Sequence, residues 1–210
     1  MIFNRTHRRT GVVGVRRRRH LGPARPRLVT GPHIPTGAPG SGKTTILDHL
    51  GTDIRTVGEP AREILAEQRA IDGEGTYDRD GQLFVDLLLQ RSIDKHLAAR
   101  REDGPVVLDR GVPDCVAYAS LMGIDPTPGM QAAEAYRYHG EVLILEPWEE
   151  IYDYDDERTM SFADTFAFHR ALVDAYERAG YALVVVPPGP VEPPAAFVRE
   201  FLSARQRNLT

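Results

Sequence analysis

The stretch PTGAPGSGKTTIL at residues 35–47 constrains the fold of this 210-residue chain more than any other feature, because it contains the spacing G-x-x-x-x-G-K-[ST]. Glycines at this spacing let consecutive backbone N–H groups converge on a phosphate group. Lys43 is then expected to reach the β- and γ-phosphates of a nucleotide, and the Thr44 hydroxyl to bind Mg²⁺. The expected nucleotide contacts are Gly37, Ala38, Pro39, Gly40, Ser41, Gly42, Lys43, Thr44 and Thr45.

A proline interrupts the segment that leads into this P-loop. A central strand of a parallel sheet is normally a continuous apolar run, and proline cannot donate a hydrogen bond to a neighbouring strand. Residues 28–31 and 34–37 each resemble part of such a strand, with Pro35 inside the second. We therefore expect either a short, distorted first strand or an insertion between this strand and the loop.

The rest of the chain alternates short apolar runs with helix-length segments, which predicts an α/β fold with a parallel sheet covered by helices. Asp80 and Ser161 are expected to cap the helices that follow them. The predicted strands are 28–36 (broken), 54–57, 106–109, 142–145 and 182–186. The predicted helices are 42–50, 61–70, 82–101, 113–122, 130–138, 162–179 and 194–204.

A second acid stands at the end of the predicted strand 106–109, where P-loop proteins place the carboxylate that holds Mg²⁺ or orients the attacking hydroxyl. Asp109 is therefore a candidate metal ligand and catalytic residue, and the adjacent Arg110 a candidate substrate contact. The alternative is that Asp109 caps the helix expected near Pro113.

Two further segments carry candidate substrate residues. Glu59 follows the second predicted strand and could hold a substrate hydroxyl or a metal-bound water, while Arg62 could bind a substrate phosphate. The alternative is an acid at a helix start with a surface ion pair. Arg158 lies in the polar loop 148–160 and could swing over the triphosphate as a catalytic arginine, unless it belongs to a solvated charge run.

Charge is distributed unevenly along the chain. Residues 1–47 contain ten bases and no acid, so they carry +10, and the remainder carries −14. We expect residues 1–26 to be a disordered arginine-rich extension and residues 27–210 to form a single P-loop domain. A basic extension of this kind can also bind nucleic acid.

Composition bears on the cellular location of the protein and on its association with membranes. Cys115 is the single cysteine, which excludes an intrachain disulfide and favours a cytoplasmic location. No apolar run approaches the roughly 20 residues that span a bilayer, so no membrane association is expected. His96, His139 and His169 have no metal-like spacing and are predicted to lie on helix surfaces.

The motifs together resemble a known family. Five segments are similar to AAA-type P-loop domains related to nicotinamide riboside kinase: GAPGSGKTT at 37–45, VGEPARE at 57–63, LDRGVPD at 108–114, DER at 156–158 and the segment 180–187. The resemblance covers residues 33–205. It implies a five-stranded parallel sheet of order 2-3-1-4-5, with ATP and Mg²⁺ as cofactors. It also implies Lys43 and Thr44 on phosphates and metal, Asp109 near metal and acceptor, and Arg158 in a lid.

These observations predict an ATP-binding P-loop enzyme, either a Mg²⁺-dependent ATPase or a kinase that phosphorylates an unidentified small molecule. Asp109 or Glu59 would orient the acceptor hydroxyl. GTP is not expected, because the chain has no Asn-Lys-x-Asp segment to recognise guanine. The alternative is a nucleotide-gated binding protein with little catalysis, which uses its basic N-terminal segment on nucleic acid or another partner.

Overall fold

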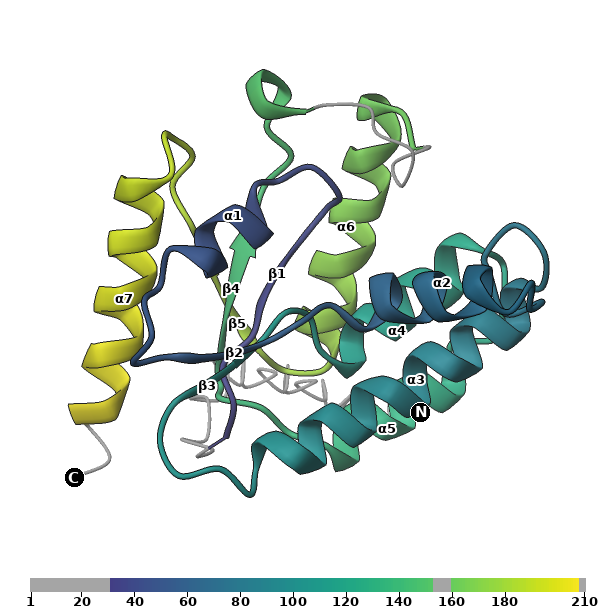
Figure 1. Cartoon of the computed structure of the whole chain (residues 1–210), viewed down its shortest axis with the longest axis horizontal. Coiled ribbons are helices and arrows are strands. Elements are labelled where there is room, and N and C mark those ends of the chain that lie inside the picture. The colour runs from purple at the N-terminus through teal and green to yellow at the C-terminus, as the bar shows by residue number, and fades with distance from the viewer. Residues whose placement is uncertain (1–30, 153–159, 208–210) are drawn as a thin grey trace, which may run out of the picture.

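The computed structural model describes residues 31–152 and 160–207 (Figure 1). The strands are β1 (Pro35–Gly37), β2 (Arg55–Val57), β3 (Val106–Leu108), β4 (Glu141–Leu145) and β5 (Ala182–Val185). The helices are α1 (Lys43–Asp48), α2 (Pro60–Ala70), α3 (Gly81–Ala99), α4 (Val112–Leu121), α5 (Thr127–Ala135), α6 (Phe162–Arg178) and α7 (Glu192–Arg207), with a 3₁₀ turn η1 (Glu149–Ile151).

All described strand pairs are parallel, but they form two groups. The order β1-β4-β5 makes one sheet of three strands, and β2 pairs with β3 in another. A single bridge between His33 and Val107 links the two groups. The predicted α/β class with parallel strands and helices is confirmed, whereas the strands form groups of three and two, so a continuous five-stranded sheet of order 2-3-1-4-5 is not confirmed.

Pro35 explains why the two groups are barely joined. His33 makes a regular pair of bonds with β3: its N–H donates to the Val106 carbonyl (2.9 Å) and its carbonyl accepts from Leu108 N–H (3.0 Å). Two residues later the Pro35 carbonyl accepts from Arg110 N–H (3.2 Å), so this residue also faces β3. Proline has no N–H to offer on that side. The ladder therefore stops after one bridge, and β1 is short, as expected from the sequence.

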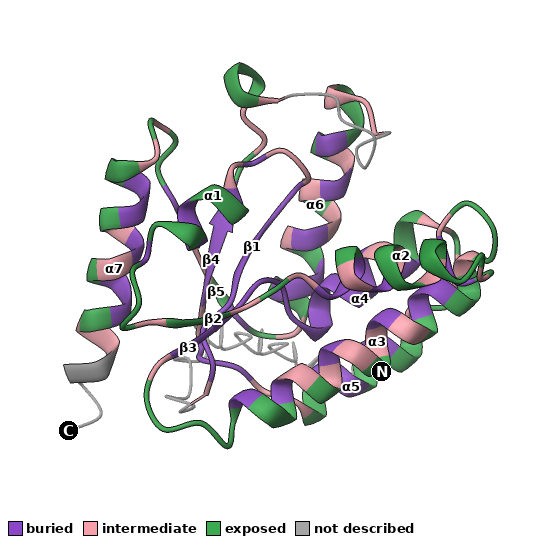
Figure 2. Cartoon of the chain, in the orientation of Figure 1, coloured by how far each residue is buried: buried purple, intermediate pink, exposed green. Residues whose placement is uncertain are grey.

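Helices lie on both sides of the strands. Helices α1 and α7 lie on one side, and α2 to α6 lie together on the other (Figure 1). The central strands β1, β3 and β4 have buried side chains on both faces, whereas no residue of β2 or β5 is buried (Figure 2). Val107 and Leu143 pack with α1 and α7, whereas Val106 and Val142 pack with residues of the opposite side. This alternation follows from the two-residue period of a strand.

The expected caps of two long helices are present. The Asp80 side chain accepts from Leu83 N–H (2.9 Å) at the start of α3, and the Ser161 hydroxyl accepts from Asp164 N–H (3.2 Å) at the start of α6. None of the helices in 31–152 and 160–207 has the length and apolar character required to cross a bilayer.

The prediction for the histidines is wrong at two positions. His96 is on α3 but only 2% exposed, with its ring 4.8 Å from that of Tyr138. His139 lies outside any helix and is buried with its ring 4.7 Å from that of His33. Aromatic neighbours can bury an imidazole, and spacing along the chain does not reveal them.

Candidate active site

The P-loop connects β1 to α1, and its glycines are required by its geometry. Gly40 and Gly42 have φ angles of 77° and 79°, in the left-handed region that other residues adopt only with strain. Gly37 has another reason: a Cβ atom there would lie 2.7 Å from the Leu145 carbonyl oxygen of β4. The three glycines therefore permit a tight turn pressed against the neighbouring strand.

A small cavity of about 50 Å³, here called the loop cavity, lies within this turn. Among the described residues, the Ser41 hydroxyl is buried without a hydrogen-bond partner. Thr44 and Thr45 are exposed and line the same cavity. A phosphate is bound by groups that donate hydrogen bonds or carry positive charge. The loop has glycine backbone, the unpaired Ser41 hydroxyl and Lys43, so it fits a nucleotide phosphate.

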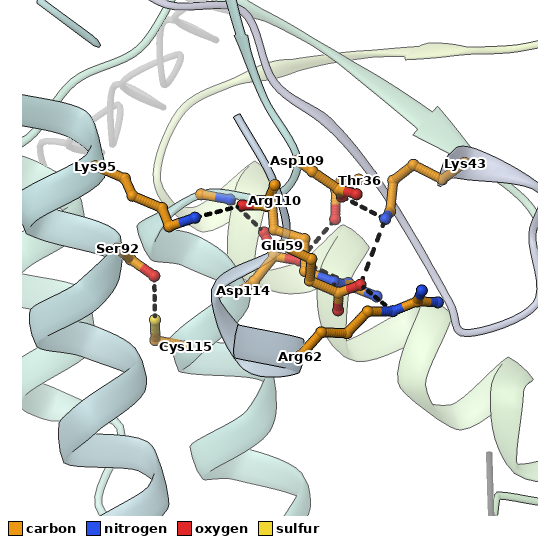
Figure 3. A network of polar contacts seen from close by, with 12 residues as sticks. Thr36, Lys43, Glu59, Arg62, Ser92, Lys95, Asp109, Arg110, Asp114 and Cys115 are labelled. Carbon is orange, nitrogen blue, oxygen red and sulfur yellow. Dashed lines mark hydrogen bonds and ion pairs between the residues drawn. The ribbon is translucent and has the colours of Figure 1, made fainter. Parts of the chain in front are cut away.

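Lys43 is buried and paired with acids from two other elements. Its Nζ donates to Asp109 Oδ1, just after β3, and lies 3.9 Å from Glu59 Oε2, just before α2 (Figure 3). Both Lys43 and Asp109 are about 5% exposed or less. The lysine expected to bind phosphate is therefore held by two carboxylates, and a phosphate would have to replace them.

Glu59 is the acid at the centre of this group. Besides Lys43, its carboxylate accepts from Arg110 Nε (2.6 Å) and lies 3.2 Å from Arg62 Nε. Burial by itself would raise the pKa of Glu59, but the charges of Arg110, Lys43 and Arg62 outweigh it and lower this pKa to about 2. The side chain is thus an ionised hydrogen-bond acceptor at neutral pH.

Arg110 is held between two carboxylates. Its Nε faces Glu59, and its Nη1 donates to Asp114 Oδ1 at 2.9 Å (Figure 3). Its backbone φ is 78°, an uncommon value for a residue with a side chain. The Phe168 ring lies 5.6 Å from the guanidinium carbon. Arg110 is 4% exposed, so its orientation is fixed by these contacts.

The polar group around the loop is balanced in charge. Each cation is within ion-pair distance of an acid, and the formal charges of the group sum to zero. The cations are Lys43, Arg62 and Arg110, and the acids are Glu59, Asp109 and Asp114.

A second cavity, of about 340 Å³, opens from the loop toward α7 and is called the proline-side cavity. It shares Gly40, Ser41, Gly42 and Thr45 with the loop cavity. Its other walls include Trp148, Ile151 and the prolines of the β5–α7 connection at 187–190. Because these walls are flat and apolar and lie beside the phosphate loop, the cavity suits the base of a nucleotide.

A third cavity, of about 460 Å³, lies on the other side of the loop and is called the aromatic cavity. It shares four residues with the loop cavity, namely Pro39, Glu59, Arg62 and Arg110. Helices α2, α3, α4 and α6 supply most of the rest, including Phe84, Tyr118 and Phe168, and Tyr77 comes from the connection between α2 and α3. Glu59, Arg62 and Arg110 lie where this cavity meets the loop, whereas Arg69 and Asp164 line it elsewhere among mostly apolar residues.

The predicted residues come together, with one exception. Lys43, Glu59, Arg62 and Arg110 line the loop cavity with the loop itself, and Asp109 contacts Lys43. Arg158 lies outside the described residues. Sequence reasoning missed Asp114 as a polar partner of Arg110, and it missed Thr36 and Tyr176, which both donate to Asp114. The i,i+4 spacing of Arg110 and Asp114 was the signal available for one of them.

Within the described residues, no group of three or more His, Cys, Asp or Glu side chains could hold a metal by itself. Mg²⁺ does not need such a cage, since it is commonly held by one or two carboxylates together with substrate phosphates. Thr44, which lines the loop cavity, and Asp109, which contacts Lys43, are of the chemical type that this arrangement requires.

A family model described as AAA domain matches residues 33–193. The chain belongs to the AAA domain family. The expected kinship with P-loop kinases and ATPases is thereby confirmed. No curated protein matches this AAA domain.

Solved structures share the fold of this AAA domain at low sequence identity. The NadR protein in complex with NR matches with a TM-score of 0.61 at 15% identity, over 83% of this chain and 50% of that one. Deoxyadenosine kinase from M. mycoides matches with a TM-score of 0.58 at 15% identity, over 82% and 99%. Thymidylate kinase from Ehrlichia chaffeensis matches with a TM-score of 0.53 at 17% identity, over 83% and 100%. This AAA domain thus spans about half the length of the NadR chain.

Proposed function

We propose that the protein is a Mg²⁺- and ATP-dependent phosphotransferase that acts on the hydroxyl group of a small molecule. The observation that carries this proposal is the order of the three cavities. The loop cavity shares residues with the proline-side cavity on one side and with the aromatic cavity on the other. A phosphate in the loop would therefore lie between a base site and an acceptor site.

The nucleotide end would work by exchange of ion pairs. The base would occupy the proline-side cavity near Trp148, and the phosphates would enter the loop. Lys43 would leave Asp109 and Glu59 for the β- and γ-phosphates, whose charge it would then neutralise. This move frees the Asp109 carboxylate.

Asp109 and Thr44 would hold Mg²⁺ at the loop. The ion, when bound, would neutralise charge on the phosphates during transfer. We also propose that Arg158 approaches the triphosphate, as the family resemblance suggests. Its placement is outside the described residues.

The acceptor end would use Glu59. Its carboxylate would accept a hydrogen bond from the acceptor hydroxyl and orient it toward the transferred phosphate. Departure of Lys43 removes one of the charges that lower the pKa of Glu59, so the carboxylate becomes a stronger base when nucleotide is bound. Arg62 and Arg110 would keep it in place while the body of the acceptor fills the aromatic cavity.

The first test is nucleotide-dependent stabilisation of the full chain. Saturation with ATP and Mg²⁺ at about 100 times Kd should add roughly 2.7 kcal/mol to the free energy of unfolding, whereas GTP should add much less. Lys43→Ala should abolish the ATP-induced shift, measured from the melting temperature of the variant without ligand. Lys95→Ala is the matched control, because Lys95 bonds to the Gly58 carbonyl and Glu63 rather than to the loop.

The second arm separates transfer from binding. Glu59→Gln should keep the ATP-induced shift and lose ADP release in the presence of hydroxyl acceptors. Absence of any ATP-induced shift in the unaltered chain would overturn the proposal. A shift without ADP release for any acceptor or for water would favour the nucleotide-gated binding protein instead.

A further inference from the structure

Asp114 receives more hydrogen bonds than any role at the start of α4 requires. Its carboxylate is 2% exposed and accepts from four donors. They are Thr36 Oγ1 (2.7 Å), Arg110 Nη1 (2.9 Å), Gly111 N–H (2.9 Å) and Tyr176 Oη (2.6 Å). These donors come from β1, the turn after β3, and α6, so one carboxylate joins three parts of the fold.

The two oxygens of this carboxylate have different partners. Oδ2 accepts from Gly111 N–H, as expected of an acid that caps its own helix, and also from the Tyr176 hydroxyl of α6. Oδ1 accepts from Arg110 and Thr36, and neither bond serves the helix start. A capping role therefore explains only one of the four contacts.

The backbone conformation of Arg110 must be stabilised by contacts with other residues. A residue other than glycine at φ 78° stores backbone strain, which surrounding contacts must offset. The guanidinium is held at both ends, by Glu59 at Nε and Asp114 at Nη1 (Figure 3). Glu59 is shared with Lys43 and Arg62, whereas the other partners of Asp114 are uncharged.

We propose that Asp114 is a positioning residue that holds Arg110 against Glu59, and that Thr36 and Tyr176 fix Asp114 in turn. Any effect of this arrangement on an acceptor molecule rests on the proposed function. Thr36 immediately precedes Gly37 of the loop, so the same carboxylate ties the nucleotide loop to the arginine beside the acceptor. Asp114 itself lines neither the loop cavity nor the aromatic cavity.

Replacing Asp114 with asparagine tests this role of Asp114, because the two side chains have nearly the same shape. The N–H groups of Arg110 and Gly111 can only donate, and they meet different oxygens of Asp114. In either orientation, the amide NH₂ of Asp114→Asn would face one of these two donors. The substitution should therefore loosen Arg110 in either orientation, because its guanidinium would face either the amide NH₂ or a neutral oxygen in place of a charged one.

The measurement is the Nε–Hε signal of Arg110 in the ¹⁵N-arginine-labelled full chain without ligand, assigned by its loss in Arg110→Lys. In the unaltered protein this proton should exchange slowly with water, because it is buried and donates to Glu59. Asp114→Asn should speed its exchange at least tenfold. Thr36→Val and Tyr176→Phe, each of which removes one hydroxyl from Asp114, should give smaller increases.

The matched control is Tyr181→Phe. Tyr181 is also buried, and its hydroxyl accepts from Tyr138 N–H (3.1 Å) without contacting Asp114. This variant should leave the exchange of the Arg110 proton unchanged. Equal effects of Tyr176→Phe and Tyr181→Phe would show a general loss of stability and overturn the proposal.

An unchanged Arg110 signal in Asp114→Asn would also overturn it. If that variant does not fold, Thr36→Val combined with Tyr176→Phe decides the question by the same readout, and an unchanged signal there refutes the proposal. The measurement needs no nucleotide or acceptor. Failure of ATP to stabilise the chain would therefore refute the proposed function and leave this result independent.

Discussion

Gly40 and Gly51 both adopt left-handed backbone conformations, with φ angles of 77° and 89°, but their surroundings differ. A Cβ atom at Gly40 would lie 2.5 Å from Cδ2 of the Tyr152 ring, whereas one at Gly51 would have no atom within 4 Å. Tyr152 cannot easily withdraw, because its hydroxyl donates to the Met160 carbonyl and its ring packs 5.3 Å from that of Phe162. Gly40 is thus required both by its left-handed backbone conformation and by the closeness of the Tyr152 ring.

Alanine at these two glycines should separate the two constraints. Gly51→Ala should lower the free energy of unfolding by about 1 kcal/mol, the conformational cost alone. Gly40→Ala should lose at least about 1 kcal/mol more, because Tyr152 must move. Urea denaturation of both variants measures the difference. Equal losses would mean that Tyr152 yields freely and does not confine the loop.

Sequence reasoning predicts individual candidate residues where spacing along the chain carries the information. Lys43, Thr44 and the loop glycines follow from one contiguous pattern. The contact between Glu59 and Arg110 joins residues 51 positions apart, and Tyr176 reaches Asp114 across 62. Only the packing of strands and helices brings such pairs together, so the pairing of Lys43 with acids and the role of Asp114 were beyond sequence reasoning.

The first strand is the element in which sequence and packing conflict. Pro35 occupies a buried position between β3 and β4, where a residue with an N–H could bond to β3. The sequence predicted a disturbed strand at this point. It did not predict that the disturbance would divide the sheet, since the direction in which the Pro35 carbonyl points depends on strand pairing.

Pro35→Ala should restore a sheet hydrogen bond. The new N–H would face β3, and its amide proton should exchange slowly in native-state hydrogen exchange. The free energy of unfolding should change by less than about 1 kcal/mol, because the added bond is offset by greater freedom of the unfolded chain. A rapidly exchanging amide at residue 35 would contradict our explanation of the interrupted ladder.

Most other elements were predicted within a few residues, because their apolar periodicity and caps are local properties. The predicted helix 162–179 corresponds to α6 (Phe162–Arg178), for example. The last helix was underestimated: α7 runs Glu192–Arg207, since its two prolines lie in the first turn, where proline is tolerated.

At the scale of the whole molecule, buried histidines should make stability depend on pH. Burial, with the nearby His139 and Arg205 charges, lowers the pKa of His33 to about 4, and burial with Arg100 does the same for His96. The unfolded chain binds these protons near the ordinary pKa of 6.5, before the folded protein does. The stabilising effect is therefore complete above pH 6.5 and is lost as the pH falls toward 4.

His96→Phe should reduce this acid sensitivity. Each such histidine contributes up to about 1.4 kcal/mol per pH unit within the window, and phenylalanine suits the aromatic surroundings of Tyr136 and Tyr138. Urea unfolding at pH 7, 6, 5 and 4 should give a shallower slope for the variant. His49→Gln, which alters an exposed histidine, should keep the original slope. A slope unaffected by His96→Phe would contradict the assignment.

The neutral charge sum of the group around Lys43 bears on how an anion would reach it. An open cluster of cations attracts a nucleotide from a distance, and salt weakens that attraction. Here all three cations are already paired, and Lys43 and Arg110 are also buried, so little of the field of the group extends into solvent. Nucleotide capture by this protein would be limited by the rearrangement of ion pairs after encounter, and its association rate would respond only weakly to ionic strength.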